Sequence, residues 1–409
     1  MSTSIQIKRT TVLQGTAQLL PASKSISNRA LILNALSGSK SSLHNLSDAN
    51  DTQLMLRLVN SNESVIDVEN AGTTMRFLTA YFAVTNQKKT ITGTERMRER
   101  PIGILVNALR MLGADVLYND KEGYPPLEIK GFERQKNDSI RIRGDVSSQF
   151  ISALMMVAPI LPHGLILELE GKVGSRPYIE MTASLMHHFG VSCQLFDDKV
   201  IIPPQSYYQT EFTVESDWSA ASYWFAFAAL AEHAEILLPR LSLKSLQGDS
   251  VIVDIMEQLG VKASLDENGL LRLTKAKEWK QFRWDFTDCP DLAQTVAVVC
   301  AAKGIPGHFT GLESLRIKET DRIAALQNEL QKIGGKLIEE DSENWKLIPA
   351  THLPMTASFK TYKDHRMAMA FAPLATLMDV TIENPAVVKK SYPNYWNDLK
   401  SLGIQITEV

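Results

Sequence analysis

The sequence predicts an α/β (α+β) protein of two similar domains, each with three βαβαββ units. Three observations predict this class. The chain has 409 residues, which is too long for one compact core. Two kinds of landmark recur about every 70 to 77 residues, apart from one shorter first interval. Between landmarks the patterns follow one order: strand, helix of small residues, strand, amphipathic helix, and short alternating strands.

The first landmark is a polar turn that runs into a helix of unusually small or apolar residues. Such a helix can be buried on all sides, and its amino end carries unpaired N–H groups and about half a positive charge. Six segments fit: SKSISNRALI from Ser23, NAGTTMRFLTA from Asn70, DVSSQFISALMM from Asp145, DWSAASYWFAFAAL from Asp217, DCPDLAQTVAVV from Asp288 and DHRMAMAFAPLA from Asp364. We expect three such ends to converge in each domain, and all six to frame one electropositive interdomain cleft.

The second landmark is an amphipathic helix that ends in an apolar residue and a glycine before a strand. Glycine suits a helix C-terminus because it adopts the left-handed conformation at no steric cost. These glycines are Gly113, Gly190, Gly260, Gly334 and Gly403. Strand patterns include LILELEG over 165–171 and the hairpin ASLDENGLLRLTKA over 263–276.

The landmarks also predict the domain boundaries. Three units precede about residue 215 and three follow it. The first strand is assigned to the second half, because the first unit begins only at about Lys24. This unit lacks about one hairpin's length of chain between Asp51 and Asn70. The predicted division is a discontinuous domain of residues 1–22 plus 216–409, an inserted domain of residues 23–215, and crossovers near 22–25 and 212–216.

Composition and charge argue against several classes of protein. A formal net charge of -3 does not suit a nucleic-acid binder that relies on bulk positive charge. The three cysteines, Cys193, Cys289 and Cys300, fit neither a disulfide framework nor a zinc pattern. The start, MSTSIQIKRTTVL, lacks the apolar core of a secretory signal, and no stretch approaches the roughly 20 apolar residues that span a bilayer. We expect a cytoplasmic protein, a monomer by default, with no nucleic-acid or membrane partner.

The helix starts of the first domain carry residues that bind anions. Lys24, Ser25 and Arg29 form the first set, and Ser25 and Arg29 lie one turn apart on one face. A serine cap beside two solvated cations explains this set about equally well. The other candidates also have plain alternatives, namely a turn, a helix cap, a solvated face or a packed tyrosine: Asn70, Gly72, Thr73, Arg100, Ser147, Ser148, Gln149, Ser175 and Tyr178.

The segment LRIKETDRIAAL is the most informative part of the second domain. Lys318 and Arg322 are four residues apart, so both are expected to project from one helical face, with Glu319 and Asp321 elsewhere. An exposed helix with salt bridges is the alternative, but the charges are crowded at the helix start. Two further cations are candidates, although single cations near a C-terminus are usually surface residues: Arg366 and Lys390.

Two carboxylates are candidates for proton transfer. Asp291 lies one turn inside a helix of small residues, where nearby cations would keep it ionised and suited to act as a base. Glu319 lies on the same approach, whereas His365 is expected to be structural. The sequence has no Ser-His-Asp set, no histidine pair at metal spacing and no dinucleotide-type glycine loop. A cation-lined site with no metal and no cofactor suits substrates that bring their own phosphates and carboxylate.

Nine segments, in order along nearly the whole chain, resemble the 5-enolpyruvylshikimate-3-phosphate synthase family: PASKSISNRALIL, NAGTTMRFLTA, MRERPIG, GDVSSQFISAL, SRPYIEM, CPDLAQT, LRIKETDRI, DHRMAM and KKSYP. Each is weak alone, and together they are highly specific. The resemblance implies two domains of three βαβαββ units. It also implies transfer of the enolpyruvyl group of phosphoenolpyruvate to the 5-hydroxyl of shikimate 3-phosphate, with release of phosphate. Closure of the domains over both substrates would exclude water.

The family pattern implies a role for each matching residue. Asp291 would accept the hydroxyl proton, while Glu319 and Lys24 are candidates for protonating the substrate methylene and assisting phosphate departure. Shikimate 3-phosphate would contact Lys24, Ser25, Arg29, Ser147, Ser148, Ser175, Asp291 and Lys318, to which we add Tyr178. Phosphoenolpyruvate would be surrounded by Lys24, Gly72, Arg100, Gln149, Arg322, Arg366 and Lys390, to which we add Asn70 and Thr73.

This chain departs from the family pattern at four places. Ala22 replaces glycine in the usual PGSKS, and the first unit is shortened. Phe77 replaces proline in the usual NAGTAMRP, which could shift the Gly72 turn and alter inhibitor sensitivity. Ser314 stands where asparagine often contacts the shikimate ring.

The sequence leaves two alternatives to the synthase. UDP-N-acetylglucosamine enolpyruvyl transferase shares the fold and phosphoenolpyruvate, but it carries a loop cysteine near the position of RMRERPIG, where this chain has none. A non-catalytic anion-binding protein on the same scaffold would lack the pair Asp291 and Glu319.

Overall fold

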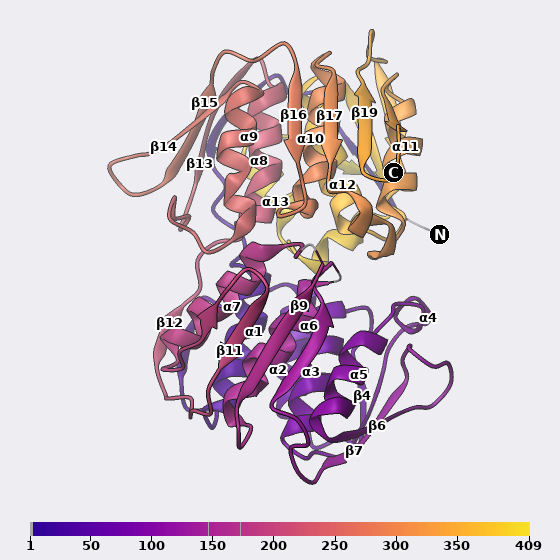
Figure 1. Ribbon diagram of the computed structural model, residues 1–409. Helices are drawn as coiled ribbons and strands as arrows, with labels where there is room; N and C mark the ends of the chain where they lie inside the picture. Colours follow the sequence, from indigo (N-terminus) through magenta and orange to yellow (C-terminus); the bar gives the residue numbers. More distant parts are fainter. Residues whose placement is uncertain (1–2, 146, 172) are drawn as a thin grey trace. The chain divides into compact units, whose positions relative to one another are not determined.

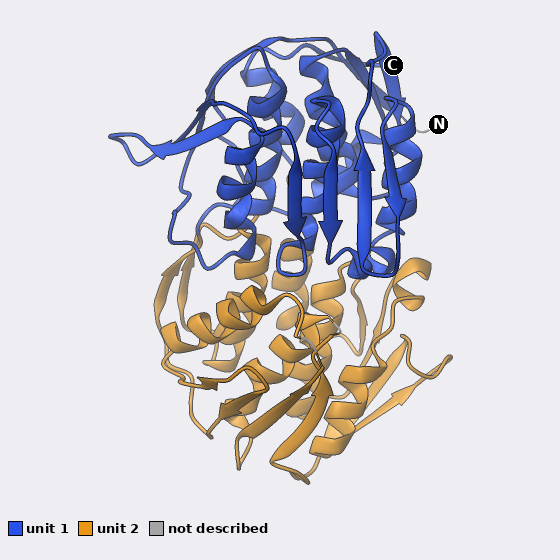
Figure 2. Ribbon diagram, turned by 45° about the horizontal axis from the view of Figure 1, so that its top comes forward, with its two compact units in different colours: residues 1–22, 48–50, 215–409 blue, residues 23–47, 51–214 orange. Residues whose placement is uncertain are grey.

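The computed structural model describes residues 3–145, 147–171 and 173–409. Two compact units divide the chain (Figure 2). Unit 1 comprises Met1–Ala22, Asp48–Asn50 and Glu215–Val409, and unit 2 comprises Ser23–Ser47 and Asp51–Val214. The short segment Asp48–Asn50 belongs to unit 1, which no sequence pattern indicates. Within unit 1, Ala22 and Ser216 form an isolated antiparallel bridge.

Three four-stranded sheets with one common strand pattern form the outer parts of unit 1, as far as the chain is described (Figure 1). In each sheet the first two strands are parallel and the other neighbours are antiparallel. The strand orders are β20 (Thr356–Phe359), β21 (Asp379–Glu383), β1 (Ser4–Ile7), β22 (Ile406–Glu408); β2 (Val12–Thr16), β13 (His233–Leu238), β15 (Leu271–Lys275), β14 (Val261–Leu265); and β16 (Phe282–Asp285), β17 (Gly307–Thr310), β19 (Asn344–Ile348), β18 (Lys336–Glu339). The chain's first strand therefore completes the sheet formed by its last strands.

Two sheets of unit 2 repeat this pattern, and a third sheet has a shortened version of it. Its four-stranded sheets have the orders β4 (Val65–Asp67), β5 (Lys89–Thr92), β7 (Leu127–Phe132), β6 (Ala114–Tyr118) and β8 (Ser139–Arg143), β9 (Leu165–Glu170), β11 (Lys199–Ile202), β10 (Gln194–Leu195). In the third sheet, β3 (Ser42–His44) pairs in parallel with β12 (Glu211–Thr213). Over the described residues this sheet has the parallel pair without the antiparallel hairpin.

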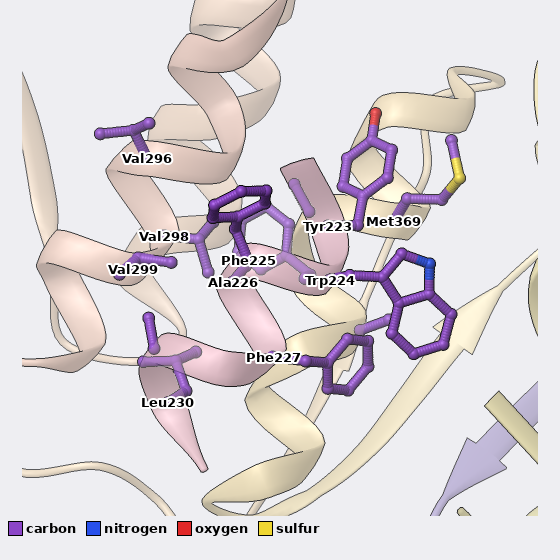
Figure 3. Close-up of a cluster of buried hydrophobic side chains, with 14 of the residues drawn as sticks. Tyr223, Trp224, Phe225, Ala226, Phe227, Leu230, Val296, Val298, Val299 and Met369 are labelled. Atoms are coloured by element: carbon purple, nitrogen blue, oxygen red, sulfur yellow. The ribbon is translucent and has the colours of Figure 1, made fainter. Parts of the chain in front are cut away.

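Three helices of small or apolar residues contact one another inside unit 1: α8 (Trp218–Leu230), α10 (Ala293–Ala302) and α12 (His365–Phe371). Nearly all of their side chains are buried. Figure 3 shows Trp224 and Phe225 of α8, Val299 of α10 and Met369 of α12 in this hydrophobic core. A helix that is apolar all round is stable only when it is buried in this way.

Unit 2 has an equivalent central group of three helices: α1 (Lys24–Leu36), α3 (Gly72–Val84) and α6 (Ser148–Val157). Ser23 caps α1 by accepting a hydrogen bond from the Ile26 amide, and Ser147 caps α6 by accepting one from the Gln149 amide. The residue that precedes α3 is Ala71, whose side chain forms no cap. The amino end of α3 therefore keeps its N–H groups available to a ligand.

A second group of helices is amphipathic. They are α2 (Asn50–Val59), α5 (Gly103–Leu112), α7 (Arg176–His188), α9 (Ile252–Gln258), α11 (Arg322–Gln331) and α13 (Tyr395–Ser401). The glycines that follow five of them have positive φ angles: Gly113 117°, Gly190 85°, Gly260 92°, Gly334 84° and Gly403 86°. The predicted left-handed helix ends are confirmed. No helix in the described part of the chain is long and apolar enough to cross a membrane.

Candidate active site

The starts of the three central helices meet in unit 1. Ser219 lies in the first turn of α8, Asp291 in the 3₁₀ turn η3 (Pro290–Leu292) directly before α10, and Arg366 in the first turn of α12. Nη2 of Arg366 donates to Asp291 Oδ2 at 2.8 Å and to Ser219 Oγ at 3.4 Å. The expected convergence of helix starts is therefore present in this unit. Asp291 lies just before its helix rather than one turn inside it.

Arg322 is the centre of the unit 1 cluster. Its Nε donates to Asp364 Oδ2 at 2.7 Å, and its two terminal nitrogens donate to Asp291 Oδ1 at 2.9 Å and Glu319 Oε2 at 2.8 Å. The Arg322 side chain is 2% exposed. Burial lowers its pKa, but the fields of Asp364, Glu319 and Asp291 raise the pKa above its usual value overall. This guanidinium is therefore permanently charged and fixed by three carboxylates.

Asp291 is held by cations on several sides. Both of its carboxylate oxygens accept from buried arginines, and Lys318 Nζ lies 4.0 Å from Oδ1. Burial raises the pKa of Asp291, but Arg366, Lys318 and Arg322 together hold it well below the usual range. Asp291 is therefore ionised at neutral pH, as expected from the sequence.

The segment before α11 corrects one sequence prediction. Lys318 and Arg322 do not share a helical face, because Asp321 is the N-cap, accepting from the Ala324 amide at 3.0 Å, and the helix begins only at Arg322. Glu319 does not project elsewhere, since it bonds to Arg322 and lies 3.4 Å from Lys390 Nζ. Lys318 and Arg322 still approach the same carboxylate, but from an extended segment and a helix start.

Arg29 of α1 occupies a second polar cluster, in unit 2. Its Nε donates to Thr182 Oγ1 at 2.7 Å, Nη1 to the Ser25 carbonyl at 3.0 Å, and Nη2 to Ser152 Oγ at 3.0 Å. The predicted adjacency of Ser25 and Arg29 is thus present. These three partners are neutral oxygens, so they do not cancel the charge of Arg29.

Two aromatic rings also lie against Arg29. Its Cζ is 5.3 Å from the centre of the Phe77 ring and 5.7 Å from that of Tyr178. Burial lowers the pKa of Arg29 to about 10, which still leaves it charged at neutral pH. Phe77, one of the departures from the family pattern, therefore lies directly against Arg29, a candidate substrate-binding residue.

Gly72 begins α3 beside two guanidinium groups. A Cβ atom on Gly72 would lie 2.6 Å from Arg76 Nη1 and 2.8 Å from Arg100 Nη1. Arg76 donates to Gln149 Oε1 at 3.0 Å. Arg100 is buried, and its Nε and Nη1 form no hydrogen bond with other described residues. Two buried cations, one with spare donors, beside an uncapped helix start suit an anionic ligand.

The remaining candidates of unit 2 vary in their surroundings. Lys24 Nζ donates to Asp51 Oδ2 at 3.3 Å. Ser147 is the cap of α6, and Ser148 beside it is buried. The partly exposed candidates are Asn70, Thr73, Gln149, Ser175 and Tyr178. Arg96 pairs with Glu99, and Arg176 with Glu180, so these two arginines serve local ion pairs.

Metal ligands do not cluster in the described part of the chain: it contains no group of three or more His, Cys, Asp or Glu residues that could hold a metal ion. His365 is buried, with Nδ1 3.5 Å from Asp364 Oδ1. The chemistry that this arrangement offers is anion binding by fixed arginines, together with proton transfer by carboxylates.

The chain is similar to known proteins over most of its length. Residues 7–62 and 57–399 match the family model described as EPSP synthase (3-phosphoshikimate 1-carboxyvinyltransferase). A curated 3-phosphoshikimate 1-carboxyvinyltransferase of Bacteroides fragilis is 50% identical over 393 residues, 95% of each chain. The chain belongs to the EPSP synthase family.

Other matches extend this result. The protein of the same name from Cellvibrio japonicus is 38% identical, with 92% of this chain and 94% of that protein covered. The solved EPSP synthase of Acinetobacter baumannii has a TM-score of 0.80 over 100% of both chains at 18% identity, which supports the fold. The resemblance and the mixed α/β fold are thereby confirmed. The matches support the EPSP synthase assignment over the sugar-nucleotide transferase.

Three residues near the candidate ligands in the two units are not predicted by the sequence patterns. Asp364 caps α12 by accepting from the Arg366 amide at 2.9 Å, and its place before a helix start was the available signal. Ser219 has the same kind of signal at α8. Arg76 lies four residues after Gly72, so the spacing of one helical turn could have placed both on one face.

Proposed function

We propose that this chain transfers the enolpyruvyl group of phosphoenolpyruvate to the 5-hydroxyl of shikimate 3-phosphate and releases phosphate. One observation carries the proposal: Asp291 is a carboxylate held by two buried arginines where helix starts meet, in a chain of this family. Both substrates are anions, and fixed cations stabilise the charge that such substrates keep through the reaction.

The proposed ligands of each substrate are those that the family pattern implies. For phosphoenolpyruvate they are Lys24, Asn70, Gly72, Thr73, Arg100, Gln149, Arg322, Arg366 and Lys390. For shikimate 3-phosphate they are Lys24, Ser25, Arg29, Ser147, Ser148, Ser175, Tyr178, Asp291 and Lys318. The burial of Arg29, Arg100 and Arg322 supports these roles, because a buried guanidinium is already desolvated and oriented before the anion arrives.

Asp291 is the proposed acceptor of the hydroxyl proton. As the oxygen of the 5-hydroxyl bonds to carbon 2 of phosphoenolpyruvate, the proton passes to the carboxylate. The cations Arg366, Lys318 and Arg322 hold the pKa of Asp291 low, which keeps it ionised but makes it a weak base. An anionic substrate that pairs with Arg322 and Arg366 would neutralise their field and raise the basicity of Asp291. The base would then become effective only with substrate bound.

A second group must deliver a proton to the methylene carbon of phosphoenolpyruvate. Glu319 and Lys24 are the proposed donors: Glu319 lies between Arg322 and Lys390, and Lys24 is half-buried beside Asp51. In the next step phosphate leaves, a base takes one proton from the new methyl group, and the double bond is restored. The same group can therefore give a proton and take one back, with Lys24 also placed to assist phosphate departure.

The proposal includes no cofactor, because the leaving phosphate is already present on the substrate. We further propose a cytoplasmic monomer without nucleic-acid or membrane partners, in the shikimate route to chorismate and the aromatic amino acids.

Phosphate release tests the proposed function. Purified protein is incubated with phosphoenolpyruvate and either shikimate 3-phosphate or UDP-N-acetylglucosamine. We expect release only with shikimate 3-phosphate. Release only with the sugar nucleotide would assign the rival reaction, and release with neither acceptor, from folded protein that binds phosphate, would leave only an anion-binding protein.

A further inference from the structure

Asp249 is a buried carboxyl group behind the unit 1 cluster, and the proposed reaction does not use it. It lies in the 3₁₀ turn η2 (Gly248–Val251) and is 3% exposed. The Ser219 hydroxyl donates to Asp249 Oδ2, and Ser219 Oγ accepts from Arg366 Nη2 at 3.4 Å. The same nitrogen of Arg366 holds Asp291 at 2.8 Å. Asp249 is thus connected through one hydroxyl to the arginine that orients the proposed base.

Helix capping does not explain this carboxyl group. The amino end of α8 is already capped, since the Ala220 amide donates to Asp217 Oδ1 at 2.8 Å and the Trp218 amide to Gln247 Oε1 at 3.1 Å. Asp249 adds nothing to these caps. Asp249 instead accepts a hydrogen bond from the Ser219 side chain, which points to a role at Arg366 rather than at the helix.

The surroundings of Asp249 favour its neutral form. Oδ1 has no hydrogen-bond partner among the described residues, and a buried ionised oxygen in that state is costly. The groups that face it are Asp217, Asp291, Arg366 and the Cys289 thiol. Burial, aided by Asp291, raises the pKa of Asp249 to about 7, although Arg366 and the Ser219 hydroxyl act in the opposite direction.

The charge of Asp249 changes the balance of charge among the ion-paired groups around Arg366. The cations are Arg322, Arg366, Lys318 and Lys390, and the ion-paired carboxylates are Asp291, Glu319 and Asp364. With Asp249 neutral, one positive charge is in excess. With Asp249 ionised, the excess is cancelled, and a second carboxylate is linked to Arg366 through the Ser219 hydroxyl.

We propose that Asp249 is a positioning residue for Arg366, acting through Ser219, and that its protonated form preserves the positive charge with which the cluster binds the anionic substrate. The inference rests on the proposed function for the identity of that substrate, phosphoenolpyruvate. It assigns Asp249 no contact with the reacting atoms. Its consequence is an affinity for phosphoenolpyruvate that falls as Asp249 loses its proton.

The pH dependence of binding tests this role. KM for phosphoenolpyruvate is measured from about pH 6 to about pH 8.5 for the wild type, Asp249→Asn and Asp254→Asn. Asp254 is an exposed carboxylate of the neighbouring helix α9 and serves as the matched control. The wild type and Asp254→Asn should show KM rising by roughly 3- to 10-fold through neutral pH, as one nearby charge appears. In Asp249→Asn this rise should be reduced to the part that comes from ionisation of the substrate phosphate.

A second variant guards against misfolding of the first. Ser219→Ala removes the hydroxyl that links Asp249 to Arg366, so the KM rise should become smaller. The midpoint of the remaining rise should move to higher pH, because the hydroxyl stabilises the ionised form of Asp249. An unchanged pH profile in folded Asp249→Asn, or an unmoved midpoint in Ser219→Ala, would overturn the proposal. A uniform loss of activity at all pH values in Asp249→Asn would also overturn it, because a merely structural role has that result.

Direct binding separates this inference from the proposed function. Binding of inorganic phosphate is measured by calorimetry over the same pH range for the same proteins. A pH-dependent affinity that disappears in Asp249→Asn supports the role of Asp249 even if no turnover is found. If the enzyme turns over, but Asp249→Asn and the wild type have the same pH dependence of phosphate affinity and of KM, the proposed function stands and the inference is rejected.

Discussion

Arg322 and Asp364 form an ion pair at 2.7 Å in which the side chains are only 2% and 0% exposed. Asp364 also accepts a hydrogen bond from the Arg366 amide and so caps the helix that carries Arg366. One carboxylate thus fixes the side chain of one arginine and the backbone of the other. Both arginines donate hydrogen bonds to Asp291, so the position of this proposed base depends indirectly on Asp364.

Asp364→Ala should be strongly destabilising, because it leaves the buried charge of Arg322 with one fewer partner and removes a helix cap. The expected loss is about 3–5 kcal/mol of unfolding free energy, measured in urea. Asp364→Asn keeps the size and the cap oxygen and should lose less. Equal stability of Asp364→Ala and the wild type would contradict this view of the pair.

Gly72→Ala tests the approach of two guanidinium groups to a helix start. The added Cβ would lie within 3 Å of Arg76 and Arg100 terminal nitrogens, so these side chains must move. We expect KM for phosphoenolpyruvate to rise by about 10-fold or more, since a displacement of one charged hydrogen bond costs roughly 1.5–3 kcal/mol. KM for shikimate 3-phosphate should change little. An increase confined to shikimate 3-phosphate would show that the arginines serve the other substrate.

Phe77→Leu removes the ring that lies 5.3 Å from Arg29. We expect KM for shikimate 3-phosphate to rise by roughly 2- to 30-fold, because a cation–π contact of about 0.5–2 kcal/mol no longer orients Arg29. Phe82→Leu is the matched control, since Phe82 is buried in the same helix but lies against Lys89. Both variants should lose stability, and equal effects on KM would argue against a specific role for Phe77.

Acid stability tests the electrostatics around Asp291. Its pKa in the folded protein lies below the value in the unfolded chain, so the folded state holds fewer protons and stability is lost as pH falls. The loss should begin below about pH 4, where the unfolded aspartate takes up its proton. The free energy of unfolding should decrease less between about pH 7 and about pH 3 for Asp291→Asn than for the wild type. Identical slopes would mean that Asp291 is not stabilised by its arginines.

Local patterns in the sequence predict much of this fold for clear physical reasons. The glycine at each helix end requires a left-handed backbone, and helices without a polar face must be buried, so both features follow from short stretches of chain. Most of the candidate cations and Asp291 are also recognisable, because they lie at or near a helix start; Lys390, at the end of a 3₁₀ helix, is an exception.

Contacts between distant segments were not predictable in this way. The spacing of Lys318 and Arg322 predicts one helical face, but Asp321 caps the helix, which therefore begins only at Arg322. Both cations still approach Asp291, Lys318 from the segment before the helix. Asp249 approaches Ser219 from a turn 30 residues later in the chain. Such pairs depend on how βαβαββ units pack, which no local pattern contains.

Turnover of Asp291→Asn tests the central claim most directly. Initial rates of phosphate release are measured with saturating phosphoenolpyruvate and shikimate 3-phosphate, on protein whose folding is checked by circular dichroism. We predict that kcat falls by about 10²- to 10⁴-fold, the usual contribution of a general base. A kcat close to that of the wild type would contradict the assignment of Asp291 as the group that accepts the hydroxyl proton.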